Sequence, residues 1–104
     1  MIDIEIVSLR KEKPSEITDF KVDRSSDLGN PFPLGNERRR DMVCDDYDQY
    51  IRDKIVARDD KIIKALNKIY AMAVIYGKAR LFCWCAPKRC HAETIRTILL
   101  EWDK

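Results

Sequence analysis

Residues 79–86, ARLFCWCA, are apolar on both faces of any strand that they form. Successive side chains of an extended chain point to opposite faces of a sheet. One face of this stretch would carry Leu81, Cys83 and Cys85, and the other Phe82 and Trp84. A strand that is apolar on both faces is typical of the middle of a parallel sheet, where other layers cover both sides. This feature therefore predicts an α/β protein in which residues 79–86 form a central strand.

Two stretches near the N-terminus have the alternation of half-buried strands. In residues 2–9, IDIEIVSL, isoleucines alternate with acidic residues, and residues 17–23, ITDFKVD, alternate through Phe20 and Val22. Residues 24–36, RSSDLGNPFPLGN, follow and hold two of the three glycines and two of the four prolines. That composition predicts a loop.

Apolar residues recur at helical spacing in three further stretches, at about 36–55, 59–76 and 91–102. Asn36 is a favourable N-cap for the first helix, and Gly77 is a natural end for the second. The predicted order of elements is β-β-α-α-β-α, in a single domain that spans residues 1–104. We expect a small three-layer, Rossmann-like α/β domain whose short, mostly parallel sheet is flanked by three helices.

The predicted topology also indicates where a ligand would bind. In open parallel sheets, ligands bind outside the carboxyl ends of the strands. Two loops leave strands at that edge, residues 24–35 and residues 86–90, and they are the two most unusual stretches of the sequence. We therefore expect the functional site between them.

Composition excludes several classes of protein. Hydrophobic residues make up 45% and charged residues 37% of the 104 residues, which is typical of a folded globular chain. The net charge of +2 argues against a general nucleic-acid coat. No apolar run is long enough to cross a membrane, and the first residues lack the order of a signal peptide. We expect a cytoplasmic protein whose four cysteines are reduced or bind metal.

Three of the four cysteines and the only histidine lie within residues 83–91. Three thiolates and an imidazole are a known zinc set, which here would be Cys83, Cys85, Cys90 and His91. Alternatively, Cys90 at a helix N-terminus beside Lys88 and Arg89 would be a reactive thiolate with a lowered pKa. The same basic pair and the helix N-terminus would also suit a phosphate group.

A purely structural interpretation of the same residues stands beside these. Cys83 on a buried strand is often a small core residue, and His91 would then only cap the helix. Trp84 and Trp102 are expected in the core. In the other loop, Arg24 at the end of the second strand would point toward a ligand, and the run Arg38–Arg40 would bind phosphate or form a solvated face.

The motifs together resemble the family named domain of unknown function 4326, common in bacteriophages and scattered in bacteria. The stretch VDRSSDLGNPF is similar to its first motif, with Asp27 where proline is usual. Tyr47, Tyr50 and Ile51 after Arg40 resemble its middle motif, and LFCWCAPKRCHAE matches its last motif nearly throughout. The resemblance implies one site containing Arg24, Asn30, Cys85, Cys90 and His91, but it implies no particular activity.

These observations lead to one leading hypothesis and two alternatives. The leading hypothesis is a pocket that binds or processes a nucleotide or another phosphate-bearing ligand. Arg24 and Arg40 would hold its charge, Asn30 would orient it, and Cys90 or His91 would act as nucleophile or general acid/base. Cys85, Lys88 and Arg89 would complete the binding site, and Glu93 is the nearest carboxylate that would orient His91.

The first alternative is a zinc-binding module that interacts with a host or phage protein and has no enzymatic activity. The second is nucleic-acid binding through Arg38–Arg40, Lys88 and Arg89, which would fall steeply with salt concentration.

Overall fold

The computed structural model of the chain describes residues 1–104 and contains three strands and three α-helices. In chain order the elements are β1 (Asp3–Ser8), β2 (Asp19–Lys21), α1 (Arg40–Val56), α2 (Asp60–Tyr76), β3 (Lys78–Cys83) and α3 (His91–Trp102). A short 3₁₀ turn, Glu37–Arg39, leads directly into α1. The β-β-α-α-β-α order and the α/β class predicted from the sequence are confirmed.

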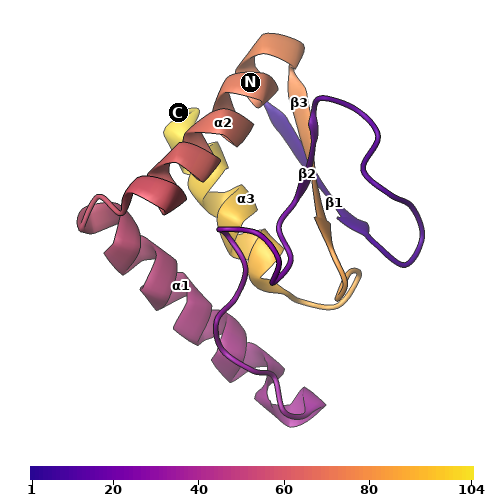
Figure 1. The fold of residues 1–104 in the computed structure, drawn as a ribbon, viewed down its shortest axis with the longest axis vertical. Coiled ribbons are helices and arrows are strands. Elements are labelled where there is room, and N and C mark those ends of the chain that lie inside the picture. Colours follow the sequence, from indigo (N-terminus) through magenta and orange to yellow (C-terminus); the bar gives the residue numbers. More distant parts are fainter.

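The sheet is entirely parallel, with strand order β1-β3-β2. Ile6 of β1 and Phe20 of β2 both pair with Leu81, so β3 lies between the two N-terminal strands (Figure 1). The prediction of a central third strand is therefore confirmed. The strand is central because both of its faces are apolar: Leu81 and Phe82 face opposite sides of the sheet, and both are fully buried.

The central strand ends earlier than the apolar run does. Ser8 pairs with Cys83 as the last register of β1, so no strand remains to pair with residues beyond Cys83. The chain turns there, and the backbone N–H of Lys88 donates to the carbonyl oxygen of Cys85 at 2.9 Å. The expectation that Trp84 belongs to the core was wrong, because the turn leaves its side chain 51% exposed.

The two faces of the sheet are covered differently. One face packs against α2 and α3 in a single hydrophobic core that includes Ile4, Leu66, Leu81 and Ile95. On the other face, Arg80 lies over the ring of Phe82 and forms ion pairs with Glu12 and Asp19. In Figure 1 the connection between β1 and β2 loops out on the side of the sheet away from the helices. The three layers are therefore the helices, the sheet, and the connection between β1 and β2, which contains no helix.

Local signals account for the helix ends. The side chain of Asp59 accepts from the backbone N–H of Ile62 at 3.1 Å and begins α2, and Gly77 ends α2 with a positive φ of 80°. Asn36 caps the 3₁₀ turn before α1 by accepting from the N–H of Arg38 at 3.0 Å. No helix of this fold is both long enough and apolar enough to span a membrane.

Candidate functional site

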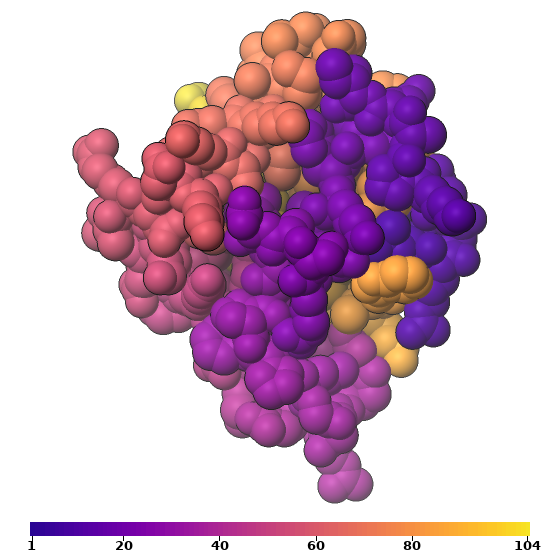
Figure 2. All heavy atoms as spheres, in the orientation of Figure 1, coloured from indigo at the N-terminus to yellow at the C-terminus, as the bar shows by residue number.

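A cavity of about 280 Å³ lies where the carboxyl ends of β2 and β3 meet the N-termini of α1 and α3. In Figure 2 the orange segment between β3 and α3 reaches the surface here, between the purple loop after β2 and the indigo N-terminal residues. The lining residues are Asp23, Arg24, Asn30, Leu34, Arg40, Val43, Cys44, Cys83, Trp84, Cys85, Cys90 and His91. The five residues that the resemblance implies for one site, Arg24, Asn30, Cys85, Cys90 and His91, all line this cavity.

The loop after β2 is folded tightly by its own side chains. Arg24 donates from Nη1 to the carbonyl oxygen of Asn30, and from Nη2 to that of Phe32 at 2.7 Å. The Oδ1 atom of Asn30 accepts from the backbone N–H of Phe32 at 2.9 Å. These hydrogen bonds join the two ends of the loop 24–32 and hold the guanidinium of Arg24 at the cavity.

Close packing explains the glycine in this loop. A Cβ atom at Gly29 would lie 2.6 Å from the carbonyl oxygen of Asp23 and 2.7 Å from the Cα of Arg24, closer than real Cβ contacts allow. On the helical side, the buried hydroxyl of Tyr47 donates to the carbonyl oxygen of Leu28 at 2.7 Å. Gly29 and Tyr47 therefore fix the position of the loop relative to α1.

Asn30 presents an unused donor to the cavity. Its side chain is only 7% exposed, and its Oδ1 is taken by Phe32. No intramolecular hydrogen bond uses its Nδ2. Every side-chain nitrogen and oxygen that is fully buried does have a hydrogen-bond partner, so Nδ2 is not among the fully buried atoms. Because Asn30 lines the cavity, its Nδ2 is a candidate donor to a ligand there.

Arg40 is the second cation of the cavity. Its Nε and Nη2 donate to the carboxylate of Glu37 at 2.8 and 2.7 Å, and its Nη1 donates to the carbonyl oxygen of Arg89 at 2.9 Å. The Glu37 carboxylate, and after it the sulfur of Cys85, raise the pKa of Arg40 further above its usual value. Arg40 thus remains charged, and its contacts with Glu37 and with the carbonyl oxygen of Arg89 fix its position.

Cys83 and Cys90 face each other in the cavity wall, with 3.1 Å between their Sγ atoms. Hydrogen bonding from Cys90, together with backbone N–H groups of Ala86 and Cys85, lowers the pKa of Cys83 to about 6 although burial opposes this. The pKa of Cys90 is raised by its hydrogen bond with Cys83 and by burial. The expected lowering of the Cys90 pKa was therefore wrong: the pKa is lowered at the neighbouring Cys83 and raised at Cys90.

His91 is held as a neutral imidazole. It is 8% exposed, and its Nε2 lies within hydrogen-bond distance of the carbonyl oxygen of Val22, which can only accept. Burial, aided by the positive charge of Arg24, lowers the pKa of His91. With the proton on Nε2, Nδ1 is an unprotonated acceptor, and since no buried nitrogen lacks a partner it keeps access to the cavity. The orienting group is thus a backbone carbonyl rather than Glu93, which does not line the cavity.

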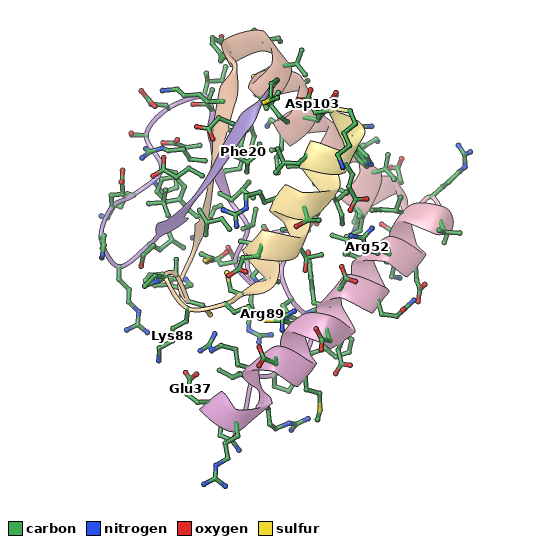
Figure 3. All side chains as sticks on the ribbon, turned by 180° about the vertical axis from the view of Figure 1, so that it is seen from behind. Phe20, Glu37, Arg52, Lys88, Arg89 and Asp103 are labelled. Atoms are coloured by element: carbon green, nitrogen blue, oxygen red, sulfur yellow. The ribbon has the colours of Figure 1, made fainter.

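Lys88 and Arg89 lie outside the cavity. Lys88 pairs with Glu37 at 3.3 Å, and Arg89 pairs with Asp41 and Asp45 at 2.9 and 2.8 Å. Figure 3 shows Lys88, Arg89 and Glu37 close together where the start of α3 meets the start of α1. These basic side chains join the two helices and do not face the space in which a phosphate was expected to meet them.

The four residues of the zinc alternative do not converge on a point. The structure contains no group of three or more His, Cys, Asp or Glu side chains arranged to hold a metal ion. His91 uses its Nε2 on Val22, and Cys85 lies beyond the end of β3 instead of sharing a strand face with Cys83. This geometry does not favour a zinc site.

Two polar cavity residues were missed by the sequence analysis. Asp23 is 8% exposed and accepts from Ser25 and, at 3.0 Å, from the indole Nε1 of Trp84. Burial alone would raise the pKa of Asp23, but the bonds from Ser25 and Trp84 outweigh it, and the pKa lies below its usual value. The sequence contained a signal for Asp23, namely its position directly after Val22 at the carboxyl end of a strand. It contained no signal for Trp84, because the exposure of Trp84 depends on where β3 ends.

Comparisons with known proteins give one match. No curated protein and no solved structure matches the chain. The model of a family described as "Domain of unknown function (DUF4326)" matches residues 7–101, which include both loops of the cavity and all three strand ends. The chain therefore belongs to the DUF4326 family.

Proposed function

We propose that the cavity binds a mononucleotide, with its phosphate toward Arg24 and Arg40 and its base against Trp84. The observation that carries this proposal is the pair of guanidiniums from separate elements that line one cavity together with the free amide of Asn30. Guanidiniums are preferred for phosphate because they donate in a planar fork that matches two phosphate oxygens.

The charges around the cavity support an anionic ligand. Arg24 donates to two backbone carbonyls and forms no ion pair, so its positive charge is not compensated by a carboxylate. Arg40 pairs only with Glu37, whose side chain is 59% exposed and shares its charge with Lys88. A phosphate would therefore meet the uncompensated guanidinium of Arg24, and would share the guanidinium of Arg40 with the exposed carboxylate of Glu37.

Trp84 supports a base as the second half of the ligand. Its ring is 51% exposed at the cavity, while its Nε1 is held by the buried Asp23. An anchored indole loses little freedom when a planar base stacks on it, and such stacking contributes about 1–3 kcal/mol per base. The volume of about 280 Å³ is near the lower limit of ligand pockets, which favours a mononucleotide over a dinucleotide.

Chemistry on the bound nucleotide would use His91 and the thiols. The unprotonated Nδ1 of His91 is suited to accept a proton from an attacking group, and Cys83 replaces Cys90 as the candidate nucleophile because it is the better thiolate. We further propose that the protein works in a reducing cytoplasm, that of a bacterium or of a phage-infected host, where these thiols stay free.

Intrinsic fluorescence provides the test, because Trp84 is one of two tryptophans. The protein would be titrated with the four common nucleoside monophosphates, ribose 5-phosphate and inorganic phosphate. We expect saturable quenching by at least one monophosphate, weaker binding of ribose 5-phosphate, and at least a tenfold loss of affinity in Arg24→Met. Arg38→Met is the matched control, because Arg38 is exposed, forms no ion pair and does not line the cavity.

Two outcomes would contradict the proposal. One is the absence of any response to all four monophosphates in protein whose circular dichroism is that of a folded α/β chain. The other is an equal loss of affinity in Arg38→Met and Arg24→Met. Binding of oligonucleotides in place of monophosphates, with a steep dependence on salt, would instead support the nucleic-acid alternative.

A further inference from the structure

All four thiols of the chain line the cavity, and two of them are in contact. The Sγ atoms of Cys83 and Cys90 are 3.1 Å apart, and each residue is almost fully buried by the surrounding protein. We infer that Cys83 and Cys90 form a redox-active dithiol, which reduces small-molecule disulfides that enter the cavity and becomes an intramolecular disulfide. This inference does not depend on nucleotide binding.

The backbone brings the two sulfurs together from rigid positions. Cys83 is the last residue of β3, and Cys90 is the residue that precedes the first turn of α3. The intervening turn is closed by the bond from the N–H of Lys88 to the carbonyl oxygen of Cys85. Formation of a disulfide requires the sulfurs to approach to about 2.05 Å, a movement of roughly 1 Å that side-chain rotation can supply.

The two thiols are not equivalent. Contact with the Cys90 thiol, and then the backbone N–H groups of Ala86 and Cys85, lower the pKa of Cys83 although burial opposes this. Cys90 keeps its proton because burial and the adjacent thiolate both oppose its ionisation. Since only the thiolate attacks disulfides, we expect Cys83 to be the attacking sulfur and Cys90 the resolving one, which the variants below test.

The reaction balances with a small disulfide, RSSR, as the oxidant. The Cys83 thiolate attacks one sulfur of RSSR, the S–S bond breaks, and the products are a Cys83–S–S–R mixed disulfide and RS⁻. The Cys90 sulfur then attacks the Cys83 sulfur and releases the second RS⁻, while the Cys90 proton passes to a released thiolate. The thiolate–thiol pair loses two electrons, and RSSR gains them to give one thiolate, RS⁻, and one thiol, RSH.

Contact between their sulfurs at the wall of a cavity distinguishes this pair from the other two thiols. Cys83 and Cys90 are both cavity-lining residues, and the cavity opens to the surface next to the exposed side chain of Trp84. Cys44 also lines the cavity, but it has no thiol partner and burial raises its pKa. We therefore expect oxidation to be confined to the pair.

Mass spectrometry tests the inference without any variant. The wild-type protein would be incubated with glutathione disulfide, blocked with N-ethylmaleimide and digested with trypsin. Trypsin cleaves after Lys88 and Arg89, so it separates the peptide 81–88, which contains Cys83 and Cys85, from the peptide 90–96, which contains Cys90. We expect these two peptides to be recovered as a disulfide-linked pair. Fragment ions should assign the link to Cys83 and Cys90, and Cys44 should carry maleimide.

Variants assign the roles of the sulfurs. Cys85→Ser is the matched control, because it removes the third nearby thiol and should leave the linked pair unchanged. Cys90→Ser should stop at a mixed disulfide with one glutathione on Cys83, and Cys83→Ser should give neither product. The inference is overturned if the folded wild type yields no linked peptides, or if the link joins Cys85 to Cys90 and is lost in Cys85→Ser. Neither result bears on nucleotide binding, which is measured separately by fluorescence.

Discussion

The imidazole of His91 is hydrogen-bonded to the backbone carbonyl of Val22, a residue 69 positions earlier in the chain. Val22 directly follows β2, and His91 is the first residue of α3, so this bond joins the two sides of the cavity. Tyr47 packs against the same ring edge-on, with 5.0 Å between the ring centroids. The histidine, on α3, is thereby fixed in one orientation and one tautomer by the residue that follows β2 and by Tyr47 of α1.

This arrangement predicts that His91 titrates below its ordinary pKa of 6.5 and is neutral at neutral pH. Because the unfolded chain binds this proton more readily than the folded one, the contribution of His91 to stability is fully present above 6.5 and falls as the pH decreases below it. Nitrogen-detected NMR of the single histidine would measure both the pKa and the Nε2–H tautomer. A pKa above 6.5, or an Nδ1–H tautomer, would contradict the assignment.

Replacement of Trp84 should weaken nucleotide binding without unfolding the protein. Since half of the ring is exposed and we assign it to stacking, Trp84→Ala should cost about 1–3 kcal/mol of binding free energy, whereas Trp84→Phe should retain part of it. Calorimetric titration with the best monophosphate measures this loss. The control is Trp102→Phe, because Trp102 packs against Tyr70 near the end of α3 and is absent from the cavity wall. Equal losses in both variants would argue against stacking on Trp84.

A methyl group at Gly29 should destabilise the loop that carries Arg24. The added Cβ would overlap the carbonyl oxygen of Asp23 at 2.6 Å, and overpacking of this kind costs about 1–3 kcal/mol. Urea unfolding of Gly29→Ala gives the stability change, and titration gives the accompanying loss of ligand affinity. Gly77→Ala is the contrasting variant: its φ of 80° makes it unfavourable too, but nothing lies near its Cβ and it is remote from the cavity. It should lower stability and leave affinity unchanged.

The ion pair between Asp19 and Arg80 should make the fold sensitive to acid. Hydrogen bonding to Arg80, with backbone N–H groups of Ser15 and Glu16, lowers the pKa of Asp19 from 3.8 to about 2. The folded-state pKa is below the unfolded one, so this stabilisation is complete above 3.8 and is lost as the pH falls toward about 2.

Asp19→Asn should remove the same stabilisation at neutral pH. The expected cost is about 2 kcal/mol, because the variant replaces a fully buried carboxylate that accepts charged hydrogen bonds. Urea unfolding at several pH values measures it, and the variant should lose the dependence on pH between 3.8 and 2. An unchanged acid dependence in Asp19→Asn would show that another carboxylate is responsible. Asp60→Asn is a suitable control, since Asp60 pairs only with the exposed Lys64.

Local patterns in the sequence were sufficient for the elements and for the place of the site. Alternation in residues 2–9, helical spacing with caps at Asn36 and Gly77, and the two-faced apolar run before Cys83 each report a local physical preference that the fold then obeys. Because parallel strands gather their carboxyl ends at one edge, the loops 24–35 and 86–90 were predicted to meet, and the cavity lies between them.

Only the tertiary structure decided which side chains face the cavity and in what state. Trp84 is exposed because β1 and β2 offer β3 no partner beyond Cys83, and Lys88 and Arg89 point away because carboxylates of the 3₁₀ turn and α1 attract them. The pKa of Cys83 is lowered and that of Cys90 raised because the turn after β3 brings the two sulfurs into contact. Charge state and orientation depend on contacts between segments distant in the chain, which no local pattern of residues records.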